Sequence, residues 1–273
     1  MKKIVCAAAT LLVAMSCARD GGPRILVLYY SQTDNTRAVA EEIGSRLGAD
    51  VEEIVAVNPY DGDFQATIER CLKEREEGVI PAILPLTCDI DAYDIIFLGY
   101  PVWFGTYAPP VAALLNIVDF GGKKIVPFCT FGSGGLDSSV KDLKAKQPDA
   151  EILPGYGVRA ARIDAMPAEV DRFLKEIGLA EGEYMQYDDF SEFAPSTEEE
   201  AAIFDAAVAG YPMIHAKAKN VASRAVENGT EYLFEAEDLP REGAPADVPP
   251  GGGIKVYVLD LEGQDPVFTQ VLR

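Results

Sequence analysis

The chain has 273 residues, of which 48% are hydrophobic and 25% are charged. These values are typical of a soluble globular protein of about two domains, and they exclude a disordered chain, a collagen-like chain and a multi-span membrane protein. The 44 acidic and 24 basic residues give a formal net charge of −20, which repels nucleic-acid phosphates and favours cationic partners.

Residues 1–17 have the pattern of an export signal. Two lysines make the start basic, and Ile4–Met15 is an apolar run that is too short to span a bilayer as a helix. Ser16 then precedes Cys17, and this ending resembles a bacterial lipobox, in which the cysteine is lipidated. We therefore expect a lipoprotein signal peptide over residues 1–17, a lipid anchor at Cys17 and a place in the bacterial cell envelope. The alternatives are a plain signal peptide and a short buried segment.

Residues 24–178 alternate between strand patterns and helical patterns, which is typical of an α/β domain with a parallel sheet. The main strands are continuous apolar runs, as expected where helices cover both faces of a sheet. We predict strands over residues 25–30, 51–57, 93–99, 124–130 and, more weakly, 152–158. We predict helices over residues 36–47, 64–77, 110–117, 138–146 and 168–177.

Residues 179–195 are acidic and aromatic with little periodicity, and we predict that they form a linker. Residues 196–273 are predicted to form a small α+β domain. Its helix begins at Ser196, which has capping-box spacing to Glu199. Two hairpins follow, the first with an Asn-Gly turn, and their strands are expected over residues 221–226, 232–236, 254–261 and 267–272.

In an open parallel sheet, ligands bind beyond the carboxyl ends of the strands. The loop after the first predicted strand opens a helix and is rich in hydroxyl and amide groups, so it is suited to a phosphate. It contains neither a GxGxxG pattern nor a GxxxxGKS/T pattern, which argues against a dinucleotide or a nucleoside triphosphate. Simple helix capping is the alternative. The candidate phosphate-binding residues are Ser31, Gln32, Thr33, Asp34, Asn35 and Thr36.

The loops after the third and fourth predicted strands complete a candidate site. One loop holds four aromatic residues, which suit stacking on a flat ring but could also pack over a helix end. The other holds three glycines, which allow the backbone to approach a ligand closely. The three loops together suit a phosphorylated planar ring, and FMN fits better than a nucleotide because the phosphate loop has no lysine and no sign of magnesium ligands. The candidates in these two loops are Pro101, Val102, Trp103, Phe104, Gly105, Thr130, Phe131, Gly132, Ser133 and Gly134.

The three loops resemble those of the flavodoxin family. The family's phosphate-binding pattern is matched by Ser31, Thr33, Asn35 and Thr36. Asp34 stands where the family usually has glycine, and a carboxylate beside a phosphate weakens phosphate binding unless it points outward. Aspartate nevertheless tolerates the left-handed backbone better than most residues. Trp103 resembles the family's ring-stacking residue, and Phe131 stands where related bacterial proteins often have histidine.

The resemblance implies a flavodoxin-like, doubly wound, five-stranded parallel sheet over residues 24–178, with FMN as cofactor and no catalytic acid–base side chain. It also implies that Trp103 and Phe131 lie on or beside the flavin ring, with the backbone of 103–105 and 132–134 at its polar edge. Residues 198–273 resemble the cystatin-like fold. They lack the Gln-x-Val-x-Gly pattern of cystatin inhibitors, which argues against protease inhibition.

The expected function is one- or two-electron transfer with FMN. A basic redox protein or a small quinone-like acceptor is the expected partner, and nucleic acid is not. One alternative is an NAD(P)H-dependent FMN or quinone reductase. Another is a non-redox envelope binding lipoprotein on a degenerate flavodoxin scaffold, which the departures at Asp34 and Phe131 keep open. A single histidine and five cysteines without a CxxC pair argue against a metal site, and Cys129 lies in an apolar strand, where a thiol is inert.

Overall fold

The computed structural model describes residues 22–239 and 253–272, so the predicted signal peptide and its Cys17 lie outside the described residues. The chain divides into two compact units between Tyr184 and Met185. Within the described ranges, no helix has both the length and the apolar character that crossing a membrane requires.

The strands of the first unit are β1 (Ile25–Tyr29), β2 (Asp50–Glu53), β3 (Ile95–Trp103), β4 (Thr106–Tyr107), β5 (Lys124–Phe131), β6 (Glu151–Ile152) and β7 (Tyr156–Arg159). They form a sheet with the order β2-β1-β3-β5-β6, in which all of these pairs are parallel. β7 also pairs in parallel with β5, and β4 pairs antiparallel with the end of β3. The predicted doubly wound parallel sheet is therefore confirmed.

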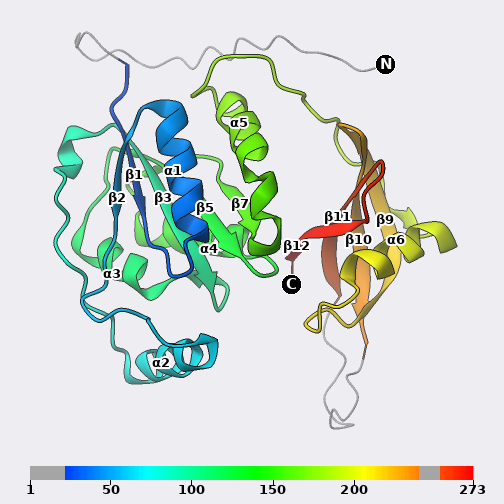
Figure 1. The fold of residues 1–273 in the computed structure, drawn as a ribbon, viewed down its shortest axis with the longest axis horizontal. Helices are drawn as coiled ribbons and strands as arrows, with labels where there is room; N and C mark the ends of the chain where they lie inside the picture. Colours follow the sequence, from blue (N-terminus) through cyan, green and yellow to red (C-terminus); the bar gives the residue numbers. More distant parts are fainter. Residues whose placement is uncertain (1–21, 240–252, 273) are drawn as a thin grey trace. The chain divides into compact units, whose positions relative to one another are not determined.

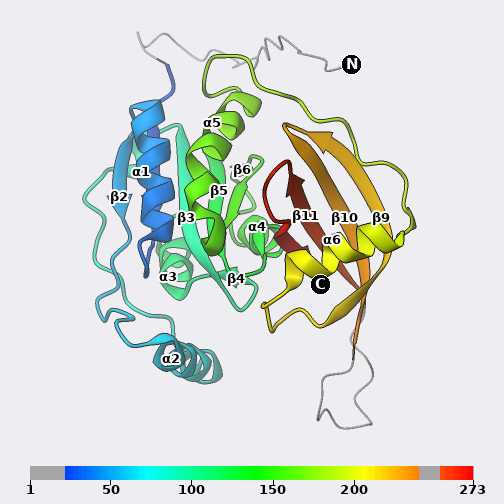
Figure 2. The same ribbon diagram turned by 45° about the vertical axis from the view of Figure 1, so that its right-hand side comes forward.

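The α-helices of the first unit are α1 (Asn35–Leu47), α2 (Phe64–Glu77), α3 (Pro109–Ile117), α4 (Leu136–Lys146) and α5 (Met166–Glu176). α1 and α5 cover one face of the sheet, and α3 and α4 cover the other (Figures 1 and 2). The apolar residues of β1, β3 and β5 point alternately into these two cores. α2 lies below the sheet in the view of Figure 1, and its buried Cys71 belongs to the same core as the apolar residues of α3 and α4.

Two predicted strands differ from the structure in their extent. The strand predicted over residues 51–57 ends at Glu53, and Ala56 instead makes an isolated antiparallel bridge to Ile83. The predicted fifth strand is divided into β6 and β7. Pro154 lies between them, and proline has no N–H with which to continue the ladder of hydrogen bonds.

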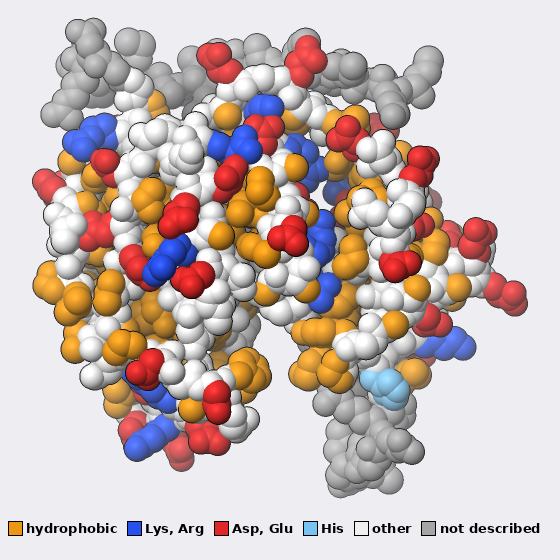
Figure 3. Space-filling view, in the orientation of Figure 1, with side chains coloured by type: hydrophobic (Ala, Val, Ile, Leu, Met, Phe, Trp, Pro, Cys, Tyr) orange, Lys and Arg blue, Asp and Glu red, His pale blue; other side chains and the backbone are white. Residues whose placement is uncertain are grey.

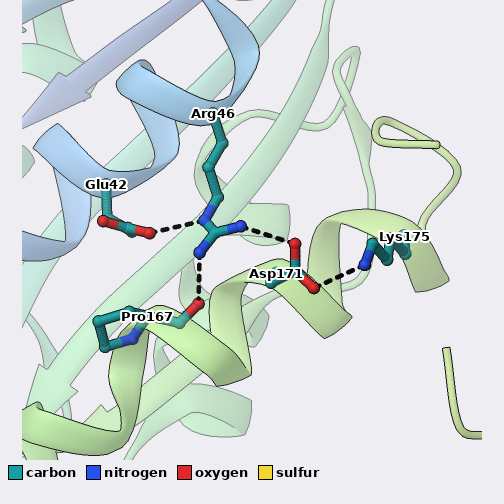
Figure 4. A network of polar contacts seen from close by, with 5 residues as sticks. All are labelled: Glu42, Arg46, Pro167, Asp171 and Lys175. Carbon is teal, nitrogen blue, oxygen red and sulfur yellow. Dashed lines mark hydrogen bonds and ion pairs between the residues drawn. The ribbon is translucent and has the colours of Figure 1, made fainter. Parts of the chain in front are cut away.

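Polar contacts join α1 to α5 on the side of these helices that faces away from the sheet. Basic and acidic side chains lie beside one another on this face (Figure 3). Arg46 of α1 donates to Asp171 at 2.6 Å and to the carbonyl oxygen of Pro167 at 3.0 Å, and it also pairs with Glu42 of its own helix (Figure 4). Lys175 donates to the second oxygen of Asp171 at 2.7 Å. These contacts fix the direction of α1, whose first two residues, Asn35 and Thr36, belong to the predicted phosphate loop.

The described elements of the second unit are β8 (Ala194–Pro195), α6 (Glu198–Val208), β9 (Ala216–Val226), β10 (Gly229–Asp238), β11 (Ile254–Leu261) and β12 (Val267–Leu272). The strands form an antiparallel sheet with the order β12-β11-β10-β9-β8. Phe204 of α6 packs against Phe234 of β10, with ring centroids 5.3 Å apart, in the core between helix and sheet. This arrangement confirms the predicted small α+β fold.

The local features of the second unit differ slightly from the prediction. The capping box lies one residue later, and the strands of the first hairpin, β9 and β10, are longer than predicted. The N-cap of α6 is Thr197 rather than Ser196, and Thr197 forms the capping box with Glu200. Ser196 is not available as a cap because its hydroxyl donates to the carbonyl oxygen of Lys219. The Asn-Gly turn is confirmed, with Asn228 in the left-handed conformation at φ 60°.

Candidate functional site

Three loops follow β1, β3 and β5, which are neighbours in the sheet. Parallel strands end at the same edge, so the loops that follow them lie side by side. The N–H of Tyr30, the first residue after β1, donates to the carbonyl oxygen of Gly99 in β3 at 3.0 Å. The structure therefore brings the three predicted loops together at the carboxyl edge of the sheet, beside the first turn of α1.

The first loop contains a polar atom that lacks a partner. The hydroxyl oxygen of Ser31 is buried and has no hydrogen-bond partner among the described residues. α1 has Asp34 at its N-cap, but no side chain caps its first turn. The first N–H groups of a helix have no partner within the helix, and they carry the positive end of its dipole. A phosphate group supplies acceptors for the hydroxyl and for these N–H groups, so the loop fits a phosphate.

The outer side of this loop is exposed. Asp34 has φ 62° and ψ −7°, the left-handed conformation for which glycine is usual, and its side chain is 76% exposed. Its carboxylate lies 3.1 Å from Arg37, which also pairs with Glu53 at 2.9 Å. The carboxylate of Asp34 therefore points outward. Thr33 is exposed as well, and its hydroxyl accepts from the side-chain amide of Asn35 at 3.4 Å.

Two side chains of the predicted phosphate site are engaged within the protein. The amide nitrogen of Gln32 donates to the carbonyl oxygen of Tyr60 at 2.9 Å and to the hydroxyl of Thr67 at 2.8 Å. The hydroxyl of Thr36 lies 2.8 Å from that of Thr130, and both residues are buried. Gln32 thus anchors the segment before α2, and the pair of threonines joins the start of α1 to the end of β5.

Trp103 belongs to a cluster of aromatic rings. Its ring packs edge-on against Tyr30 at 5.9 Å and Tyr60 at 5.1 Å between centroids. The guanidinium of Arg70 lies 3.7 Å from the ring centre of Tyr60, whose hydroxyl donates to Glu74. Burial and the neighbouring carboxylate raise the pKa of the Tyr60 phenol. The sequence reasoning missed Tyr60, whose only signal is its place in an Asn-Pro-Tyr-Asp-Gly stretch that is typical of a turn.

The tip of the aromatic loop is a tight turn between β3 and β4. Phe104 and Gly105 form it, with φ of 52° and 81°. The ring of Phe104 is 48% exposed, and the guanidinium of Arg75 in α2 lies 5.3 Å from its centre. The hydroxyl of Thr106 is the second buried hydroxyl without a partner in the described part of the chain. No sequence pattern marked Thr106 as a candidate.

The other residues predicted in this loop belong to the end of β3. Pro101 pairs with the end of β5, and Val102 pairs with Tyr107 of β4. Val102 also packs on the third loop, because a Cβ atom at Gly135 would lie 2.5 Å from its side chain. Only a glycine at position 135 leaves room for this contact, which holds the second and third loops together.

The residues predicted in the third loop are divided between strand and surface. Thr130 and Phe131 end β5, and Phe131 is 5% exposed, with its ring against Gly157 of β7. Its side chain therefore packs in the core. The carbonyl oxygen of Gly132 accepts from Arg159 at 3.0 Å. The last two predicted residues of this loop, which are partly exposed at the start of the turn into α4, are Ser133 and Gly134.

The described cysteines do not provide a reactive thiolate. Burial raises the pKa of the Cys71 thiol to about 11, and burial together with Glu52 raises that of Cys88 to about 12. Cys129 is fully buried, and burial raises its pKa further. All three thiols stay protonated near neutral pH. The part of the chain that the structure describes also contains no group of three or more side chains that could hold a metal ion.

Comparison with known proteins places the first unit in a family. The family model of the flavodoxins matches residues 24–168, which is more than half of the chain. Among the solved structures, a putative flavoprotein from Bacteroides eggerthii is 28% identical, with a TM-score of 0.51 over 57% of this chain and 98% of that chain.

Two other solved structures are similar over the same unit. A putative flavoprotein from Bacteroides uniformis is 23% identical, with a TM-score of 0.49 over 55% of this chain and 99% of its own. A flavoprotein from Lactobacillus acidophilus, in complex with FMN, is 24% identical, with a TM-score of 0.45 over 50% and 93%. None of the curated proteins matches this chain. On the strength of the family match and the sheet that carries it, the chain belongs to the flavodoxin family.

Proposed function

We propose that this protein binds FMN at the carboxyl edge of its parallel sheet and transfers one or two electrons. FMN is the cofactor, because the chain belongs to the flavodoxins and its first loop fits a phosphate. The observation that carries the proposal is the buried hydroxyl of Ser31, which has no partner among the described residues and lies beside the uncapped start of α1. A buried hydroxyl without a partner costs about 1–3 kcal/mol, and a phosphate oxygen removes that cost.

Different side chains bind different parts of FMN. Ser31 and the first N–H groups of α1 hold the phosphate, with Thr33 and Asn35 at its exposed side. Trp103, braced by Tyr30 and Tyr60, provides an aromatic wall for the ring. Bound FMN supplies the redox chemistry, so the protein needs no acid–base side chain and acts by binding, orientation and charge.

The charge of the protein supports a positively charged electron-transfer partner. Residues 24–178 carry 24 acidic and 15 basic side chains, and residues 179–273 carry 19 and 6. Such a surface attracts a basic protein and repels other anions. It also disfavours added negative charge on the flavin, which lowers the reduction potential. A basic redox protein is the partner that we propose, and a small neutral quinone-like acceptor is the other candidate.

We further propose that the protein is exported and anchored in the bacterial cell envelope by a lipid on Cys17. The order of two lysines, an apolar run and a cysteine in residues 1–17 supports this proposal. Phase partition of the full chain with a detergent tests it. We expect the wild type in the detergent phase and Cys17→Ser in the aqueous phase, and a wild type found in the aqueous phase would contradict lipidation.

A visible absorption spectrum tests the function. The protein without residues 1–17 is measured before and after addition of FMN and desalting, and we expect a retained and perturbed flavin spectrum. A folded protein that stays colourless would contradict the redox function and favour a binding role on a degenerate scaffold. Oxidation of NADPH by the flavin-loaded protein then distinguishes a reductase from a carrier, for which we expect no oxidation.

A further inference from the structure

Asp34 and Arg37 form an unusual pair at the start of α1. Asp34 is the N-cap residue, and an aspartate there ordinarily accepts hydrogen bonds from the N–H groups of the first turn. Such a bond would occupy the donors that a phosphate needs, and it would place a negative charge beside a dianion. In the structure Asp34 makes no capping bond, and its side chain is 76% exposed.

The left-handed backbone of Asp34 and its ion pair with Arg37 both accompany the outward position of this carboxylate. Its Nη1 lies 3.1 Å from Asp34, and its Nη2 donates to the two oxygens of Glu53 at 3.0 and 2.9 Å. Glu53 is the last residue of β2, so the guanidinium is held between the sheet edge and the loop. The Arg37 side chain is 40% exposed, and it is the only basic residue between positions 25 and 45.

The position of Arg37 is unfavourable for the helix by itself. A cation in the first turn opposes the helix dipole, which favours anions there. The two ion pairs of Arg37 offset this cost. Arg37 therefore joins the start of α1 to the end of β2 through Glu53, and to the loop through Asp34.

We propose that Arg37 is a positioning residue for the phosphate site, which holds the carboxylate of Asp34 away from the first-turn N–H groups of α1. This inference rests on the proposed function, because it assumes that FMN is the ligand. Arg37 acts through Asp34. Without Arg37, the carboxylate loses its outer ion pair and can turn toward the start of the helix, where its negative charge opposes that of the phosphate. The loss is confined to ligands that carry a phosphate.

The test compares FMN with riboflavin, which has the same ring and no phosphate. Dissociation constants are measured by quenching of flavin fluorescence for the wild type, Arg37→Met, Asp34→Gly and the double variant. We expect Arg37→Met to weaken FMN binding by about tenfold or more, where tenfold corresponds to 1.4 kcal/mol, and to leave riboflavin binding unchanged. Asp34→Gly in the Arg37→Met background should restore FMN binding, because glycine adopts the left-handed backbone without a carboxylate.

Arg46→Met is the matched control. Arg46 lies on the same helix and also makes two ion pairs, but its partners are Glu42 and Asp171, away from the loop. It should lower the unfolding temperature without changing the ratio of FMN to riboflavin affinity. Equal weakening of both flavins by Arg37→Met, or a double variant that stays weak, would overturn the inference: the first result indicates a structural role, and the second a direct contact of Arg37 with the phosphate.

The result also separates this inference from the proposed function. If the folded wild type binds neither flavin, both are wrong. If the wild type binds FMN and Arg37→Met binds it equally well, only the role of Arg37 is wrong.

Discussion

The two units of this protein differ in the partners of their polar side chains. In the second unit, charged side chains pair across neighbouring strands, as between Arg224 and Glu231 at 2.6 Å and between Lys219 and Glu237 at 2.7 Å. In the first unit, two buried hydroxyls, those of Ser31 and Thr106, lack partners among the described residues. Both lie at the carboxyl edge of the parallel sheet, Ser31 in the loop after β1 and Thr106 at the start of β4.

This difference indicates which unit is built for a ligand. A buried hydroxyl without a partner lowers stability, so it is expected where a bound group completes its hydrogen bonds. Ion pairs between strands at or near the surface contribute little each and favour the register of the sheet. The described hydroxyls that a ligand could complete therefore lie in the first unit.

The largest effect is expected from Phe234→Ala in the second unit, which tests whether flavin binding in the first unit is independent of the second. Phe234 is fully buried against Phe204, so its truncation should cost about 3–5 kcal/mol of unfolding free energy. We expect the unfolding transition of the second unit to move to lower temperature in circular dichroism, while the temperature of flavin release stays constant. Phe97→Ala, at a fully buried position of β3, is the matched control and should impair flavin binding. Flavin release that follows the Phe234 transition would show that the two units are coupled.

A smaller and more specific effect is expected from Ser31→Ala. It removes a hydroxyl that has no partner among the described residues, so the protein without flavin should become more stable by about 1 kcal/mol. The affinity for FMN should fall by about 10- to 100-fold, the equivalent of a hydrogen bond to a charged group. Urea unfolding and fluorescence titration measure the two quantities. Ser45→Ala, exposed on α1, should change neither. A loss of stability in Ser31→Ala would contradict the interpretation of its hydroxyl as a ligand group.

The parallel sheet and the position of its three loops could be predicted because buried strands are continuous apolar runs. β1, β3 and β5 have this pattern, and their loops meet because their carboxyl ends share one edge. The end of β2 was less predictable, because the isolated bridge from Ala56 to Ile83 depends on a segment distant in sequence. The capping box was misplaced by one residue because serine and threonine stand side by side at 196 and 197.

The local sequence does not predict which side chains of the site face a ligand and which form hydrogen bonds within the protein. Gln32 and Thr36 have the composition of a phosphate loop, yet their partners Thr67 and Thr130 lie 35 and 94 residues away. Nothing in a linear pattern distinguishes a hydroxyl that faces a ligand from one that faces another strand. Tyr60 was missed for the same reason, since its ring reaches Trp103 only through the fold.

Thr130→Val tests whether the buried threonine pair is structural. The substitution leaves the hydroxyl of Thr36 buried without its partner, which should cost about 1–3 kcal/mol of unfolding free energy. The double variant with Thr36→Val removes both hydroxyls and should recover much of this loss. Urea unfolding of the four proteins gives the coupling between the two residues. A double variant that is as unstable as the sum of the single changes would mean that the two hydroxyls do not interact.

The smallest expected effect is a pH dependence that arises at Glu52 in β2. Burial raises the pKa of this carboxyl, but hydrogen bonds from Cys88 and Thr87 outweigh burial and leave the pKa below its usual value. A lowered pKa in the folded state means that the stabilisation is fully present above the pKa of the unfolded chain, about 4.3, and is lost as the pH falls through the folded value. We therefore expect Glu52→Gln to lower the unfolding free energy at pH 7, and the difference from the wild type to shrink as the pH falls below about 4. Urea unfolding at pH 7 and at a pH below about 4 measures this difference, with Glu76→Gln at an exposed position of α2 as the control. If the difference in unfolding free energy between the wild type and Glu52→Gln is the same at both pH values, the charge of the carboxylate does not contribute to stability.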